Sequence, residues 1–116
     1  MTPHELMHRI DALASHVWVV RTFVKHSEEA EESPELMEVV RDLYDFCLAL
    51  GPSLQAADAE GYLKIVRKKL PRLERAAERF AVLAPQVSAH TNFKMAVQSL
   101  ATAVGDMARL MADAGR

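Results

Sequence analysis

The chain has 116 residues, of which 50% are hydrophobic and 26% are charged, with one cysteine and a formal net charge of −2. This length favours a single domain over residues 1–116, and the lone Cys47 excludes a disulfide framework of the kind that supports small secreted proteins. The longest stretch without Lys, Arg, Asp or Glu is shorter than the roughly 18 residues of a membrane span, and the N-terminus lacks a secretory pattern. We therefore expect a soluble cytoplasmic protein without membrane association.

The first predicted helix covers residues 3–28. Alanine and leucine are abundant and isoleucine is scarce, a usage that favours helix over strand. Thr2, Pro3 and Glu5 supply an N-cap threonine, a first-turn proline and the glutamate of a capping box. Apolar residues then recur at steps of three and four and form a seam: Leu6, Ile10, Leu13, Val17, Val20 and Val24.

The second predicted helix covers residues 34–50. Ser33-Pro34-Glu35 repeats the start signal, and Gly51-Pro52 predicts the end of the helix. Its seam consists of Leu36, Val40, Leu43, Cys47 and Leu50.

Two further helices are predicted over residues 57–83 and 87–113, separated by Ala84-Pro85. Asp58, or earlier Ser53, can cap the first of them. Their seams consist of Ala59, Leu63, Val66, Leu70, Leu73, Ala77 and Phe80, and of Phe93, Val97, Leu100, Val104, Met107 and Met111.

These four seams predict an all-α fold, an up-down-up-down antiparallel four-helix bundle. Such seams pack at shallow angles, and short connections make consecutive helices antiparallel. Pro71 interrupts the third predicted helix. Because it falls away from the seam, we expect a kink on the solvent side and not a break.

The first two predicted helices carry more apolar residues than one bundle requires. Exposed apolar stripes usually mark a partner surface, so we predict a homodimer that buries the outer faces of helices 3–28 and 34–50. Trp18 and Arg21 are candidate hot spots, because these residue types dominate interface energetics. A monomer with wide seams is the alternative. The predicted interface residues are Trp18, Val19, Phe23, Met37, Tyr44 and Leu48.

Charges are segregated along the chain. Residues 28–45 contain eight acids and one base, whereas residues 64–79 contain seven bases and two acids. Five of these bases share one helical face, which we interpret as a solvated face that meets the acidic helix or another protein. They are Lys64, Lys68, Arg72, Arg75 and Arg79. We do not expect nucleic-acid binding, because no aromatic residue interleaves the basic stripe for stacking on bases.

His4-Glu5-Leu6-Met7-His8 matches the H-E-x-x-H pattern of zinc proteases. Glu5 already completes the capping box, however, and no third histidine follows at the required spacing. The same segment contains one E-x-x-H motif, whereas di-iron bundles need two, with glutamates on other helices. We interpret the match as coincidence.

His26, Glu29 and His90 are the more serious candidates for a metal site. In an up-down bundle, the end of the first helix and the start of the last lie at the same end. Two imidazoles and a carboxylate can then bind a divalent metal and leave one position open. Alternatively, His90 is a hydrogen-bonded residue at the boundary of the seam, and His26 is a histidine at a helix C-terminus, where the dipole favours a cation.

The segment Ala89-His90-Thr91-Asn92-Phe93-Lys94 resembles the phosphorylatable helix of histidine phosphotransfer domains, which are four-helix bundles. The resemblance implies His90 as the phosphoryl acceptor. Phe93 stands where that family has lysine, and the following glycine is missing.

The remaining chemistry is sparse. Cys47 falls on a seam and is expected to be an inert buried thiol, and the chain contains neither a glycine-rich phosphate loop nor a nucleophile elbow. We therefore expect a non-enzymatic module that acts through protein–protein contacts as a homodimer. A divalent-metal-binding bundle, and then a phosphotransfer module at His90, are the alternatives.

Overall fold

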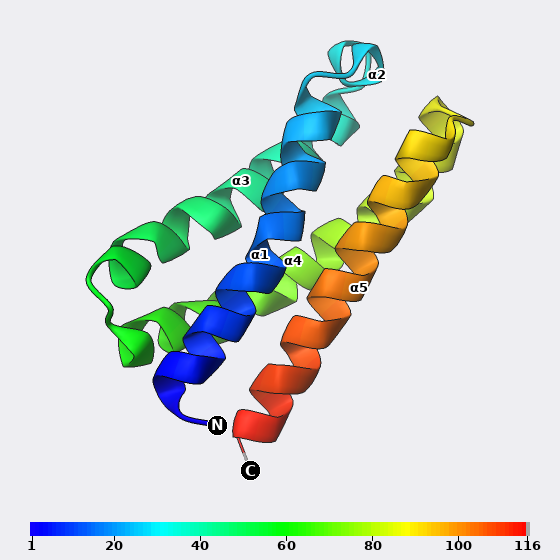
Figure 1. The fold of residues 1–116 in the computed structure, drawn as a ribbon. Helices are drawn as coiled ribbons and strands as arrows, with labels where there is room; N and C mark the ends of the chain where they lie inside the picture. The colour runs from blue at the N-terminus through cyan, green and yellow to red at the C-terminus, as the bar shows by residue number, and fades with distance from the viewer. Residues whose placement is uncertain (116) are drawn as a thin grey trace.

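The computed structural model describes residues 1–115, which contain five helices and no strand (Figure 1). This confirms the prediction of an all-helical protein. The two chain termini lie at the same end of the molecule (Figure 1). The helices are α1 (Pro3–Lys25), α2 (Glu28–Glu31), α3 (Pro34–Gln55), α4 (Ala59–Val87) and α5 (Thr91–Ala114).

The caps predicted for α1, α3 and α4 are confirmed by their hydrogen bonds. The backbone N–H of Glu5 donates to the Thr2 hydroxyl at 3.1 Å, and the backbone N–H of Thr2 donates to the Glu5 carboxylate at 3.1 Å. These bonds favour the ionised carboxylate and lower the pKa of Glu5. Ser33 caps α3, and Asp58 caps α4 by accepting from the N–H of Gly61 at 3.0 Å.

Two of the predicted helix ends are wrong. Helix α3 continues through Gly51 and Pro52 to Gln55, and α4 continues through Pro85 to Val87. An internal proline removes one backbone hydrogen bond, but tertiary packing of an apolar face can outweigh that loss. Both prolines are exposed, whereas Leu83 and Ala84 are buried and Leu54 packs against the core.

The segment predicted as one helix over residues 3–28 is divided in two. Helix α1 ends at Lys25, and the Ser27 hydroxyl caps the short α2 by accepting from the N–H of Ala30 at 3.2 Å. Ala30 is buried and anchors this turn. Helix α5 begins at Thr91 instead of residue 87, because α4 extends through that part of the chain.

The four long helices enclose one hydrophobic core. Helix α1 packs against α3 and α5, and α4 packs against the same two helices. The predicted seams supply most of the buried residues. Leu13, Cys47 and Val97 are half-buried at the margin. Within residues 1–115, no helix is both long and apolar enough to cross a membrane.

Charged residues join α3 to α4. Asp42 pairs with Arg72 at 3.0 Å, and Glu38 pairs with Arg79 at 2.6 Å. The Arg79 guanidinium lowers the pKa of Glu38, and Glu38 raises that of Arg79. The acidic and basic segments of the sequence thus meet within the molecule. Arg72, Glu38 and Arg79 are exposed and Asp42 is half-buried, so water reaches both pairs and each contributes little stability by itself.

Candidate functional site

An aromatic–arginine cluster, made of Trp18, Arg21 and Tyr44, bridges α1 and α3 at the surface. The guanidinium carbon of Arg21 lies 4.6 Å from the centre of the Trp18 ring and 4.9 Å from that of Tyr44. The two ring centres are 6.1 Å apart, with their planes inclined by 40°. Contacts of a cation with two aromatic faces hold these three side chains in one arrangement.

Large apolar side chains flank this cluster on both helices. Val19 is 64% exposed and Leu48 is 59% exposed, while Trp18 itself is 44% exposed. Leu48 follows Tyr44 by one turn of α3, so both lie on the same side of that helix. We call the surface formed by the cluster together with Val19 and Leu48 the α1–α3 face.

Phe23 and Met37, two of the predicted interface residues, are half-buried and pack against the core. Phe23 packs edge-on against Phe93 of α5, with ring centres 5.0 Å apart. The exposed apolar surface is therefore centred on Trp18, Val19 and Leu48.

A hollow of about 310 Å³ lies between α1 and α3 beside the cluster. We call it the α1–α3 hollow. Small residues form part of its wall, and a side-chain β-carbon built at Gly51 would meet no atom within 4 Å. The hollow is lined by Asp11, Ala14, Ser15, Trp18, Val19, Cys47, Leu50, Gly51 and Leu54.

Cys47 contributes a thiol to this hollow, but not a nucleophile. Its burial raises the pKa to about 11, and the opposing charges of Arg21 and Asp11 have smaller effects. A thiol with this pKa is protonated at neutral pH, whereas reaction requires the thiolate. The prediction of an inert, largely buried cysteine agrees with this environment.

Arg21 has unused hydrogen-bonding capacity. Its Nε is buried and has no acceptor among residues 1–115, and its Nη1 donates a long hydrogen bond of 3.4 Å to the Thr22 hydroxyl. Sequence reasoning identified Trp18 and Arg21 as candidate hot spots but not their contact with Tyr44. The partner is 23 positions away from Arg21, so only tertiary packing reveals it.

His26 and His90 each form a hydrogen bond with the backbone of their own helix end. Among the described residues, they do not form a metal-binding group with Glu29. The His26 ring is bonded through Nδ1 to the carbonyl of Thr22 at 2.9 Å. His90 is the N-cap of α5, and its Nδ1 accepts from the N–H of Asn92 at 3.0 Å. Within residues 1–115, no three His, Cys, Asp or Glu side chains form a group that could hold a metal ion.

The H-E-x-x-H segment also serves structural roles. Glu5 belongs to the capping box, and Nε2 of His4 lies 3.1 Å from the carbonyl oxygen of Ala57 in the α3–α4 connection. His4 thus links the start of α1 to this connection. The interpretation of the pattern as coincidence is consistent with these contacts.

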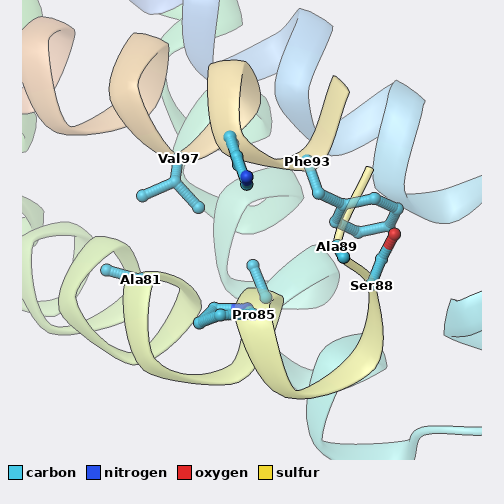
Figure 2. Close-up of a pocket in the computed structure, with 8 residues that line it drawn as sticks. Ala81, Pro85, Ser88, Ala89, Phe93 and Val97 are labelled. Carbon is cyan, nitrogen blue, oxygen red and sulfur yellow. The ribbon is translucent and has the colours of Figure 1, made fainter. Parts of the chain in front are cut away.

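A second hollow, of about 350 Å³, lies between the end of α4 and the start of α5 (Figure 2). Figure 2 shows Pro85 and Ala81 on one wall and Phe93 and Val97 on the other. Lys94 is the one charged residue of its lining, which contains no carboxylate, imidazole or thiol. This lining provides neither an acid–base pair nor a set of metal ligands.

Comparisons with known proteins find no relative of this chain. No protein-family model, no curated protein and no solved structure matches the chain. The functional argument therefore depends on the surface itself.

Proposed function

We propose that this protein is an interaction module that forms a homodimer through the α1–α3 face. One observation carries the proposal: large apolar side chains from two helices are exposed around the aromatic–arginine cluster. Val19 and Leu48 each expose more than half of their surface, beside Trp18 and Tyr44. Water contact with apolar surface is unfavourable, so covering this face in a dimer stabilises the assembly.

The composition of the face supports a protein partner. Tryptophan, tyrosine and arginine are the residue types that most often contribute a large share of binding energy at interfaces. Arg21 already contacts the rings of Trp18 and Tyr44 within one copy. Less conformational freedom is then lost when a partner binds, because these side chains are already ordered.

Sedimentation velocity over a range of protein concentrations tests the proposal with a matched pair of variants. Val19→Asp places a charge in the α1–α3 face, whereas Val82→Asp makes the same change on α4 at a valine of similar exposure, 61%. We expect the wild type and Val82→Asp to sediment as dimers and Val19→Asp as a monomer. A wild-type monomer throughout, or equal effects of the two substitutions, contradicts the proposal.

The same proposal includes the finer architecture, an up-down-up-down antiparallel bundle whose α4 bends at Pro71. The short connections between helices and the adjacent chain ends (Figure 1) support the topology. Pro71 is exposed and cannot donate a hydrogen bond to the preceding turn, which supports a bend. Residual dipolar couplings of amides on the two sides of Pro71 will fit two axis directions if α4 bends, and one if it is straight.

A further inference from the structure

We propose that the two copies pack about a two-fold axis, with Val19 of each copy seated in the α1–α3 hollow of the other. This inference rests on the homodimer proposed above and specifies how the α1–α3 face meets itself. In a two-fold interface the same patch occurs on both sides, so every projection needs a matching depression within that patch. The α1–α3 face and the α1–α3 hollow share Trp18 and Val19, so a projection and a depression occur within one patch and meet this condition.

The order of side-chain sizes along α1 favours an antiparallel arrangement. Ala14 and Ser15 are small and lie one turn before the bulky Trp18 and Val19. When two copies of α1 run antiparallel, the earlier turn of one lies opposite the later turn of the other. Large residues then face small ones at two equivalent places. Gly51 widens the hollow further, because the space at its β-carbon position is open.

The charges of α1 agree with the same arrangement. Asp11 lines the hollow, and Arg21 belongs to the cluster beside it. They are separated by ten positions, or about 15 Å along the helix. Both charges act on the pKa of Cys47, so both lie near the thiol that lines the hollow. Antiparallel pairing brings Asp11 of one copy close to Arg21 of the other, twice.

Arg21 is suited to receive such a carboxylate. It makes no ion pair within residues 1–115, and its present hydrogen bond to Thr22 is long. A carboxylate of the second copy would accept from the remaining guanidinium N–H groups, and hydrogen bonds between charged groups are the stronger kind. Shape and charge thus point to the same pairing.

Filling the hollow gives the sharpest test. Ser15 is exposed in the hollow, so Ser15→Trp fills it while leaving the core intact. If Val19 of the second copy occupies the hollow, the dimer dissociation constant increases about tenfold or more. If the copies merely associate through exposed apolar surface, the added tryptophan makes the dimer tighter. Thr102→Trp, at an exposed position of α5, is the control and leaves the dissociation constant unchanged.

Exchanging the charges of Asp11 and Arg21 tests the pairing of the two copies independently of the volume of the hollow. Asp11→Lys and Arg21→Glu each weaken the dimer. The double variant binds more tightly than either single variant, because the opposite charges face each other again, although the contacts of Arg21 with Trp18 and Tyr44 stay lost. Failure of this rescue, together with a tighter Ser15→Trp dimer, overturns the inference while leaving the homodimer intact. A wild type that is monomeric throughout overturns the homodimer and the inference with it.

Discussion

The guanidinium of Arg21 lies over the ring of Trp18 at 4.6 Å, within one turn of α1. The same group lies 4.9 Å from the ring centre of Tyr44, so one arginine connects two helices. At an exposed site each such cation–π contact contributes about 0.5–1 kcal/mol. These contacts hold Trp18, Arg21 and Tyr44 in one arrangement, so the α1–α3 face is an ordered surface.

Arg21→Leu should lower the free energy of unfolding by about 1 kcal/mol, because the two cation–π contacts are lost. The measurement is urea unfolding followed by circular dichroism, in the Val19→Asp background to separate folding from association. Arg67→Leu is the control, since Arg67 is exposed on α4 and belongs to neither aromatic contact. Equal losses in the two variants would show that the stacking contributes nothing.

Ala57→Gly should stabilise the protein by about 1 kcal/mol. Ala57 follows the end of α3 with φ of 54°, in the left-handed region where a β-carbon is unfavourable and glycine is the usual residue. Ala56→Gly is the matched control, because Ala56 has a right-handed helical conformation and gains nothing from glycine. Thermal unfolding should show a higher Tm for the first variant alone, and a lower Tm there would contradict the prediction.

Tyr62→Phe should leave stability unchanged or raise it by up to about 1 kcal/mol. Tyr62 is fully buried, and its hydroxyl has no hydrogen-bond partner among residues 1–115. The same burial raises its pKa. Removing an unsatisfied buried hydroxyl removes its desolvation penalty. Tyr44→Phe provides the comparison at a half-buried tyrosine, and a clear destabilisation specific to Tyr62→Phe would reveal an ordered water bound to the hydroxyl.

The Glu38–Arg79 pair should make stability depend on pH. Arg79 lowers the pKa of Glu38 below its ordinary value of 4.5, so the native state favours the ionised carboxylate. The stabilisation is present above that ordinary value and is lost as the pH falls through the lowered one. The wild type should therefore be slightly more stable than Arg79→Gln at pH 7 and equal to it in strong acid. Arg75→Gln, an exposed change on the same helix, should show no such convergence when urea midpoints are compared across pH.

The starts of α1, α3 and α4 were predictable from the sequence because capping is local. Thr2 and Glu5 satisfy each other within three positions, and Ser33 and Asp58 act over the same distance. The seams were predictable for a similar reason, since a period of three and four residues needs no knowledge of the neighbouring helix. These two signals together specify an all-helical protein with one core.

Tertiary structure decided where the helices end and which side chains meet. Pro52 and Pro85 lie inside helices because core packing of their neighbours outweighs a lost backbone hydrogen bond. His26 and His90 bind backbone atoms of their own helix ends, so the predicted metal triad does not form in the described part of the chain.

At the aromatic–arginine cluster too, the sequence predicted one part of the arrangement and the tertiary structure decided the rest. The sequence alone determined that helices 3–28 and 34–50 carry surplus apolar residues, because that property follows from composition and periodicity. Only the packing of α1 on α3 decided that Arg21 contacts both Trp18 and Tyr44 and that an open hollow lies beside them. Contacts between distant positions depend on how two helices approach, and helical periodicity does not encode that approach.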